Sequence, residues 1–337
     1  MKCKLGRLRI PLRSAVLSAV LLGGCKTSDD ATAAASQMAT TSQQLSSYYK
    51  ALQTTFEQTD ELYQLNEQLY SKPYTQENQQ LLKSNEAELA KRAQLAADLS
   101  SLSESFGALS GSTVPSSAAS DASQVEADVE KLASLKASST EQGALKLAVQ
   151  QLATAIQEHK EREAAKAMEG AAQSLSDLFA KEEDVWNSTE QVYAQIAANL
   201  ATSLVDANVT DNSAVLDVAL TPFGLVRNAS VGDMDEKLAP VAKQQIATKK
   251  TAMDAAYQSA TDGMAKALAQ MAQRIQTVAG GKPMTERRAP LSLATVQQWV
   301  TQVNSVANTL APASGAAAST TKSSTAGTTK SGTAKEK

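Results

Sequence analysis

The stretch LSDLFAKEEDVWNSTEQVY, residues 175–193, carries a large aromatic side chain at every seventh position, namely Phe179, Trp186 and Tyr193. Side chains seven residues apart lie close to one line along an α-helix, so the stretch predicts one face of a long helix. A second stretch, LQTTFEQTDELYQLNEQLY at 52–70, aligns with the first without gaps. Continued back by one repeat, its seven-residue line comprises Tyr49, Phe56, Tyr63 and Tyr70. These lines predict helix-packing aromatic stripes inside an all-α bundle; the alternative is an exposed stripe for a partner helix or a ligand.

The two stretches share more than their spacing. Leu, Phe, Glu, Gln and Tyr recur at equivalent positions, and Tyr63 corresponds to Trp186. A common heptad phase generates such matches, whereas a true duplication would imply two related helical hairpins. Polar residues also interrupt the lines, at Thr59, Asn66, Glu182 and Thr189. Such residues lower stability but can fix the register of packed helices. For Glu182 the pattern predicts either a surface edge or a paired polar group.

The rest of the chain predicts further helices joined by turns. Apolar residues recur at helical spacing over about 38–70, 75–109, 121–137, 143–205, 233–278 and 292–310. Pro73 separates the first two helices, and the short turn there makes them antiparallel neighbours. Ser138 and Glu141 form a capping-box pattern, which marks a helix start. Gly170 is the candidate for a bend in the longest helix.

Together these patterns predict an elongated antiparallel bundle of long, coiled-coil-like helices over residues 38–310. The bundle is least regular at 206–232, where turn signals surround the apolar residues 215–220. Residues 311–337 contain no large apolar side chain and are expected to form a disordered low-complexity tail.

Composition excludes most catalytic chemistry. The 337-residue chain is 42% hydrophobic but only 4% aromatic, with one histidine and two cysteines. So few aromatic residues disfavour a sandwich, a barrel or a large pocketed enzyme, while a helical bundle can be built from Ala and Leu. His159 stands in a charged run and is expected to be solvated, and no second histidine is available for a zinc site or a catalytic triad. We therefore expect no enzyme, metal or cofactor.

The N-terminus is organised as a secretory leader. Basic residues at 2, 4, 7, 9 and 13 precede an apolar run at 14–22, which is too short to span a membrane as a helix. The run ends in Leu22-Gly23-Gly24-Cys25, which resembles the lipobox of bacterial lipoproteins. The resemblance covers residues 1–25. It implies a signal peptide at 1–24, cleavage between Gly24 and Cys25, and covalent lipid, with fatty acids such as palmitate, on Cys25.

The lipoprotein resemblance also implies a location in the cell. Removal of 1–24 would change the formal net charge from −3 to −8, because five basic residues leave with the leader. That charge and a membrane location disfavour nucleic acid as a partner. Lys26 follows the modified cysteine, which in this family favours the outer membrane over the inner, with the periplasmic face as the default orientation. Residues 25–37 are small and polar and are expected to form a lipidated tether.

The C-terminal lysine, Lys337, resembles the residue through which murein lipoprotein is linked to peptidoglycan. This chain departs from that family by its length and by the low-complexity segment before Lys337. The other interpretation is a flexible soluble tail, and it is the one we prefer.

Three functions are compatible with these patterns. The first is a membrane-anchored, non-enzymatic envelope lipoprotein that acts as a spacer or scaffold. It would bind another envelope protein through a helix face or the 206–232 segment. The second is a membrane-active protein resembling α-helical pore-forming toxins, with 215–220 and 223–226 as its apolar element. The third is a ligand-binding bundle with a pocket near Trp186 or Tyr193.

Overall fold

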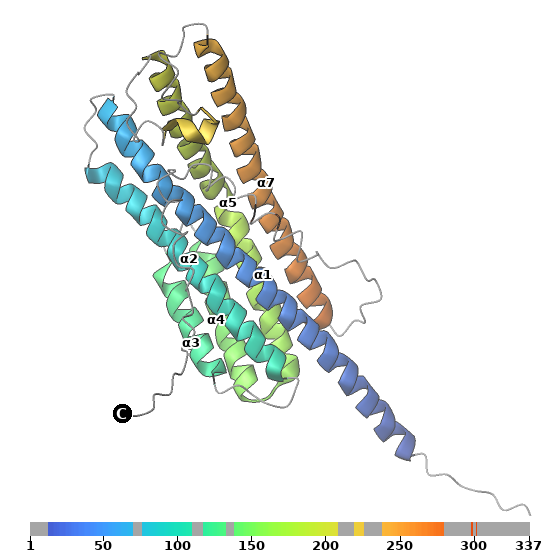
Figure 1. Ribbon diagram of the computed structural model, residues 1–337. Coiled ribbons are helices and arrows are strands. Elements are labelled where there is room, and N and C mark those ends of the chain that lie inside the picture. Colours follow the sequence, from blue (N-terminus) through green and yellow to red (C-terminus); the bar gives the residue numbers. More distant parts are fainter. Residues whose placement is uncertain are drawn as a thin grey trace, which may run out of the picture.

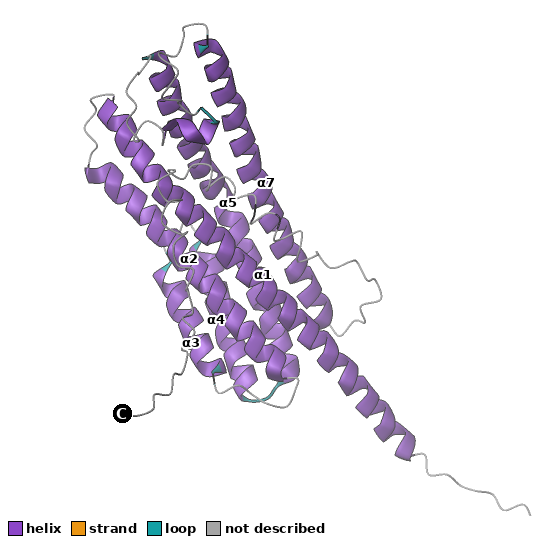
Figure 2. Ribbon diagram, viewed as in Figure 1, coloured by secondary structure: helices purple, strands orange, loops and turns teal. Residues whose placement is uncertain are grey.

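The computed structural model describes residues 13–69, 76–109, 117–132, 138–207, 219–225 and 238–279, together with Gln298 and Thr301; for 13–31 it describes the backbone alone. Throughout these residues the protein is helical and contains no strand (Figure 2). The elements are α1 (Arg13–Leu69), α2 (Gln76–Leu109), α3 (Ala118–Lys131), α4 (Ser139–Gln157), α5 (Glu161–Asp206), the 3-10 turn η2 (Thr221–Phe223) and α7 (Ala239–Ala279). The all-α prediction is confirmed.

Consecutive helices run antiparallel and form an elongated bundle (Figure 1). Two serines show the pairing of α1 and α2: Ser46 Oγ donates to the backbone oxygen of Ala93 (2.7 Å), and Ser100 Oγ donates to that of Ala39 (2.8 Å). α7 also runs antiparallel to α1, since the hydroxyls of Tyr48 and Thr261 are 2.6 Å apart while Arg274 donates to Gln37 (3.1 Å).

The bundle has two halves of different construction. The α3–α4 hairpin lies along only one end of the longer helices (Figure 1). We call that end the six-helix half; it comprises the hairpin with residues 34–48 of α1, 92–109 of α2, 161–182 of α5 and 261–279 of α7. The remaining parts of α1, α2, α5 and α7 form what we call the four-helix half, and both names refer to the described residues. Ser138, at the start of α4, lies at the junction and donates to Glu182 of α5.

The first helix begins far earlier than the expected position near Met38. α1 runs as one helix from Arg13 through the segment 25–37, for which a tether was expected. Ala34 and Ala35 are buried, because α2 approaches this part of α1 at a glycine. A Cβ atom placed on Gly107 would lie 3.4 Å from that of Ala35, so only small residues fit between the two helices here. A run of small side chains is thus compatible with close helix packing as well as with a tether, and at Ala34 and Ala35 the structure shows close packing.

The predicted single helix over 143–205 was wrong, because the chain reverses within its charged run. α4 ends at Gln157, and His159 adopts a left-handed conformation with φ of 55°. His159 N donates to Ile156 O (3.1 Å) and Lys160 N donates to Ala155 O (2.8 Å), the hydrogen-bond pattern of a Schellman C-cap. His159 is exposed, as expected. Gly170 causes no break in α5.

Other boundaries differ by a few residues. α3 ends at Lys131 instead of about 137, and α7 begins at Ala239 instead of about 233. Pro240 lies in the first turn of α7, where its missing N–H breaks no helical hydrogen bond. The predicted helix at 292–310 and the tail at 311–337 lie outside the described residues, apart from Gln298 and Thr301, which are helical and exposed. Among the described helices, none is both long and apolar enough to cross a bilayer.

Candidate functional site

The aromatic stripes of α1 and α5 lie against each other in the core. Phe56 packs edge-on against Tyr193 with ring centroids 4.5 Å apart, and Tyr49 packs against Trp186 at 6.3 Å. The step from Tyr49 to Phe56 is one heptad along α1, and the step between their partners, from Trp186 to Tyr193, is one heptad along α5 in the same direction. α1 and α5 therefore run parallel and in heptad register. Phe179 completes the seam with contacts to Tyr48 and Tyr49. All of these rings are at least 96% buried. The side chain of Tyr63 and the whole of Tyr70 lie outside the described residues.

A buried group of charges lies beside this seam, at the junction of the two halves. Arg92 of α2 donates from Nε to Glu182 Oε2 (2.6 Å) and from Nη2 to Glu182 Oε1 (2.8 Å), which makes a bidentate pair. Nη1 of the same guanidinium donates to Glu88 Oε2 (2.8 Å). The side chains of Arg92 and Glu182 are only 1% and 0% exposed. We call Glu88, Arg92 and Glu182, together with Ser138, the junction cluster.

Neighbouring groups complete the junction cluster. Ser138 Oγ donates to Glu182 Oε1 (3.2 Å), and the guanidinium carbon of Arg92 lies 5.3 Å from the ring centroid of Trp186. Glu182 therefore connects α5 to both α2 and the start of α4. Of the two interpretations of Glu182, the paired polar group is the one observed. The predicted capping box is absent, because the Ser138 hydroxyl bonds to Glu182 and makes no cap hydrogen bond to α4.

The electrostatics of the junction cluster keep Arg92 charged. Burial alone would lower the pKa of Arg92, but hydrogen bonds to Glu182 and Glu88 and the charge of Glu182 outweigh it and raise that pKa. Burial, together with the nearby charge of Glu182, raises the pKa of the Tyr49 hydroxyl well above its usual range. Tyr49 therefore stays neutral beside the charged pair, and the arrangement is suited to holding helices in one register.

Sequence inspection missed Arg92 and Glu88. Their spacing of four residues is typical of solvated ion pairs on a helix surface, so the local pattern gives no sign of burial. Glu88 directly precedes Leu89 and Arg92 directly precedes Ala93, so both border a face of apolar residues, a signal that could have indicated a partner across the core. The polar seam residues Thr59 and Thr189 have no described side chains, while Asn66 is half-buried.

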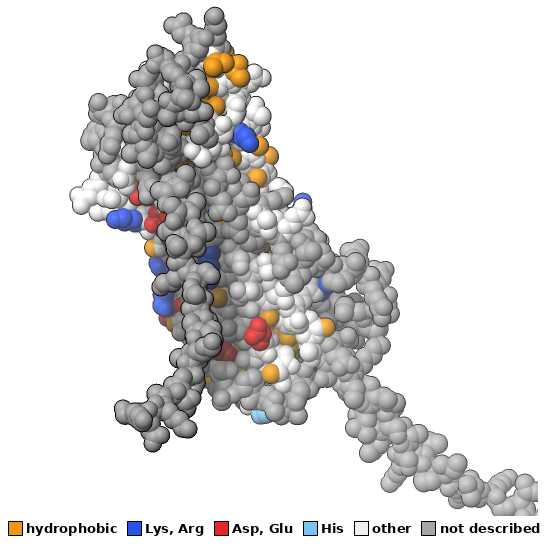
Figure 3. All heavy atoms as spheres, viewed as in Figure 1, with side chains coloured by type: hydrophobic (Ala, Val, Ile, Leu, Met, Phe, Trp, Pro, Cys, Tyr) orange, Lys and Arg blue, Asp and Glu red, His pale blue; other side chains and the backbone are white. Residues whose placement is uncertain are grey.

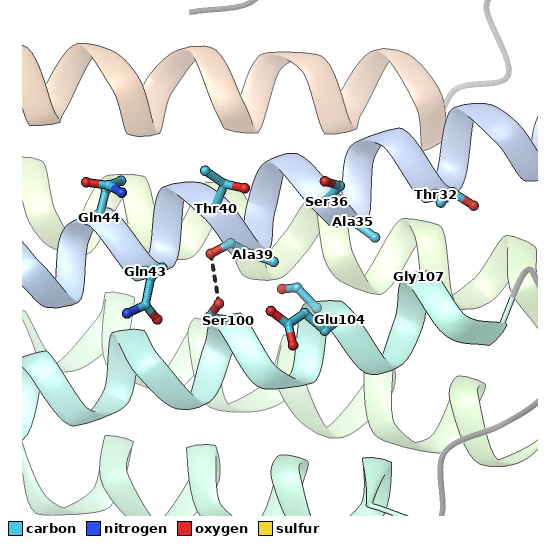
Figure 4. A pocket seen from close by; sticks show the side chains of 11 residues that line it. Thr32, Ala35, Ser36, Ala39, Thr40, Gln43, Gln44, Ser100, Glu104 and Gly107 are labelled. Carbon is cyan, nitrogen blue, oxygen red and sulfur yellow. Dashed lines mark hydrogen bonds between the residues drawn. The ribbon is translucent and has the colours of Figure 1, made fainter. Parts of the chain in front are cut away.

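Surface hollows occur in the described part of the chain, and two of them lie between neighbouring helices. One, of about 460 Å³, lies between α1 and α2 and is lined mostly by small polar side chains, including Ser36, Thr40, Ser100 and Glu104 (Figure 4). The other, of about 510 Å³, lies between α4 and α5 beside Leu147, whose side chain is exposed. Neither hollow is lined by Trp186 or Tyr193, the residues near which a ligand pocket was considered.

The described residues contain no candidate metal centre. No group of three or more His, Cys, Asp or Glu side chains there is arranged to hold a metal ion. Charged side chains of both signs are scattered over the face shown in Figure 3, among the residues that it colours. Leu220 and Phe223, from the apolar element of the membrane-active alternative, are buried, and the backbone oxygen of Phe223 accepts from Gln245 of α7 (2.8 Å).

The residues of the lipobox fall in the part of α1 that leads away from the bundle. The backbone of Gly24, Cys25 and Lys26 is helical, and the side chains of these residues are outside the description. Figure 1 shows this N-terminal part of α1 extending past the ends of the other helices. Lys337 also lies outside the described residues.

No family model matches the chain, and no curated protein or solved structure is detectably similar to it. The structure defines the protein as an elongated all-α bundle with a buried charge cluster between two differently built halves.

Proposed function

We propose that the protein is a lipid-anchored, non-enzymatic spacer of the bacterial envelope, which faces the periplasm and holds an interaction surface away from the membrane. The observation that carries this proposal is the position of Leu22-Gly23-Gly24-Cys25 near the end of α1 that extends past the bundle (Figure 1). An acyl anchor at Cys25 would leave the whole bundle on the aqueous side. Two or three acyl chains anchor a protein firmly.

The length of α1 supports a spacer role. Cys25 precedes Ala34, the first buried residue among the described side chains of α1, by nine residues, or about 14 Å of helix. From Ala34 to the end of α1 at Leu69 the same helix continues for about 50 Å. The junction cluster and the aromatic seam join α1, α2, α4 and α5 along this length, which favours a stiff body over a flexible one.

The end of the bundle far from Cys25 is the better candidate for the interaction surface. η2 and the beginning of α7 lie there (Figure 1), and the described part of the 206–232 segment packs on α7 through Gln245. Leu238 and Val241 are 53% and 59% exposed at the start of α7. Figure 3 shows hydrophobic side chains at this end of the molecule. Exposed apolar groups of this kind are suited to binding another protein.

The anchor is tested with the two cysteines of the full chain. Cys25→Ser should move the protein from the membrane fraction to a soluble or unprocessed species, and incorporation of a clickable palmitate analogue should be lost. Cys3→Ser is the matched control, because Cys3 belongs to the leader; it should leave both properties unchanged. A Cys25→Ser variant that stays in washed membranes and still incorporates the analogue would contradict lipidation.

The choice of membrane is tested at the next residue. In a host with enterobacteria-like lipoprotein sorting, we expect the wild-type protein in outer-membrane fractions of a density gradient. Lys26→Asp should shift it toward the inner membrane, and Lys26→Arg should not. Wild-type protein in inner-membrane fractions would contradict the outer-membrane assignment while leaving the lipid anchor intact.

The interaction surface is tested by photo-crosslinking in living cells. A photoreactive residue at Val241, far from the anchor, should give a defined protein adduct. The same residue at Thr154, which is exposed on α4 near the anchored end, is the matched control and should give none. Adducts of equal yield from both positions, or from neither, would contradict a partner at the far end.

A further inference from the structure

Two carboxyl groups face each other where the α3–α4 hairpin packs on α2. Asp98 of α2 and Asp128 of α3 are hydrogen-bonded to each other. Asp128 is 3% exposed, and its Oδ1 accepts from Lys131 (2.9 Å) and Gln124 (3.2 Å). Its Oδ2 is buried and accepts no hydrogen bond from the described residues. Two ionised carboxylates only accept, so a hydrogen bond between these two side chains needs a proton on one of them.

Among the described residues, the groups around Asp98 include no cation that pairs with it. On its own helix, Gln94 Nε2 donates to both Asp98 oxygens (3.0 and 3.1 Å). On α3 the facing charges are Asp121, Asp128 and Lys131, and Lys131 is paired with Asp128. On α4, Lys146 is paired with Glu130 of α3.

α1, which packs on the other side of α2, has no charged residue between 32 and 49. Asp98 therefore faces two carboxyl groups and forms no ion pair within the described residues.

These surroundings shift the pKa values of Asp98 and Asp128 in opposite directions. Burial, the hydrogen bond to Asp128 and the negative charges of Asp128 and Asp121 raise the pKa of Asp98 to about 6, although Gln94 opposes the shift. Burial would raise the pKa of Asp128 as well, but hydrogen bonds from Asp98, Lys131 and Gln124 and the charge of Lys131 outweigh it and lower that pKa. The shared proton therefore resides on Asp98.

We propose that the contact between α2 and the α3–α4 hairpin is a proton-controlled clasp, closed when Asp98 and Asp128 share a proton and weakened when both are ionised. A carboxyl with a higher pKa in the folded than in the unfolded chain favours folding while it is protonated. That advantage is lost as the pH rises through the folded-state pKa of Asp98, so the clasp tightens in mildly acidic solution and loosens toward neutral and alkaline pH.

The loosening should be confined mainly to α3. α4 packs mainly against α5, where a Cβ atom on Gly170 would lie 3.3 Å from that of Ala148, so this contact is a close one between small residues. Two other contacts titrate in the same direction. Burial and the charge of Asp262 on α7 raise the pKa of Glu183 on α5, and burial and the charges of Glu57 and Asp60 on α1 raise the pKa of Glu86 on α2. α4 is therefore the internal reference against which α3 is compared.

The test is amide hydrogen exchange of the full chain in mild detergent at pH 5.0 and 7.5, corrected for the intrinsic pH dependence of exchange. We expect protection of α3 (118–131) to be severalfold greater at pH 5.0, while α4 changes much less. A pKa of about 6 for Asp98 permits at most about a tenfold change between these two pH values, and the partial exposure of Asp98 reduces the effect. Asp98→Asn, which supplies an amide donor at every pH, should give α3 its high protection at both pH values.

Asp177→Asn is the matched control. Asp177 is an exposed residue of α5 that accepts from Gln173, four residues earlier, as Asp98 does from Gln94. This variant should keep the wild-type pH dependence of α3. The proposal is overturned if wild-type α3 is equally protected at both pH values, or if Asp98→Asn keeps the wild-type difference.

A second measurement covers the case in which Asp98→Asn does not fold. Carboxyl carbon-13 chemical shifts of the wild-type chain should show Asp98 titrating near pH 6. A midpoint below about 4.5, within the ordinary range of aspartate, would overturn the proposal without any variant.

Discussion

The two halves of the bundle are packed with different side chains. In the six-helix half, small residues bring helices close together: Gly107 meets Ala35, Gly170 meets Ala148, and the hydroxyl of Ser100 bonds directly to the α1 backbone. In the four-helix half, larger groups such as Phe56, Tyr193, Tyr257 and Phe223 fill the interior. Buried aromatic rings such as Tyr48, Phe106 and Phe179 also occur in the six-helix half, so the close helix contacts at small residues are what distinguish it. Side-chain size sets the distance between helices, and these small residues allow six helices to share one core.

The junction cluster occurs where these two packing regimes meet. The α3–α4 hairpin ends at this level, which leaves polar backbone and side-chain groups to be satisfied. Glu182 accepts from both Arg92 and Ser138, so the end of the hairpin and the long helices are held by the same carboxylate. The junction cluster therefore marks the boundary between the two halves and holds them in alignment. The following variants test how far the stability of each half depends on it.

The largest effect is expected at the junction. Glu182→Leu leaves the buried Arg92 with only Glu88, so the free energy of unfolding should fall by about 3–5 kcal/mol. Arg92→Met combined with Glu182→Leu should recover part of that loss, because no buried cation remains. Urea denaturation followed by Trp fluorescence measures both. A single variant as stable as the wild type would show that the junction cluster does not hold the halves together.

A similar but smaller loss is expected for the aromatic seam of the four-helix half. Phe56→Ala removes the ring that packs on Tyr193, and the resulting cavity should lower the free energy of unfolding by about 3–4 kcal/mol. Leu81→Ala is the control in the same half, because Leu81 is 61% exposed; it should change stability by less than about 0.5 kcal/mol. Amide exchange should rise first in residues 183–206 of α5. A uniform rise in both halves would contradict separate packing.

Replacing a glycine with a larger side chain tests the close packing of the six-helix half. Gly170→Leu places a large side chain where α4 and α5 are closest, and should destabilise the six-helix half by about 1–3 kcal/mol. Gly143→Ala, also in this half, meets nothing within 4 Å and should stabilise α4 by up to about 1 kcal/mol through helix propensity. Thermal denaturation ranks the two variants. If Gly170→Leu matched the wild type, close packing would not define this half.

The smallest effect is expected at the turn between α4 and α5. His159 adopts a positive φ that glycine accepts without steric cost. His159→Gly should therefore raise the free energy of unfolding by about 0.5–1 kcal/mol. His159→Ala, which keeps the Cβ atom but removes the ring, is the control and should give no such gain. Equal stability of the two variants would contradict backbone strain as the cause.

Much of the fold follows from local patterns in the sequence. Helical periodicity predicts α1, α2, α3 and α7 to within the differences described above, and the seven-residue spacing of Phe179, Trp186 and Tyr193 predicts a single helix face. The lipobox resemblance and the absence of familiar catalytic motifs also come from the sequence alone. These features are local, because each depends on residues within a few turns of one another.

The tertiary structure decided which faces meet and which charges are buried. Periodicity gives the face of a helix but not its partner, so the parallel pairing of α1 with α5 could not be predicted from the stripes. The run EHKERE at 158–163 suits an exposed helix and an exposed turn equally well, and only the packing of α4 on α5 selects the turn. Arg92 has the spacing of a surface residue and becomes a core residue because Glu182, ninety positions away, supplies its counter-charge. Burial is a non-local property: it depends on which of several apolar faces associate, and that competition is settled only when all the helices pack together.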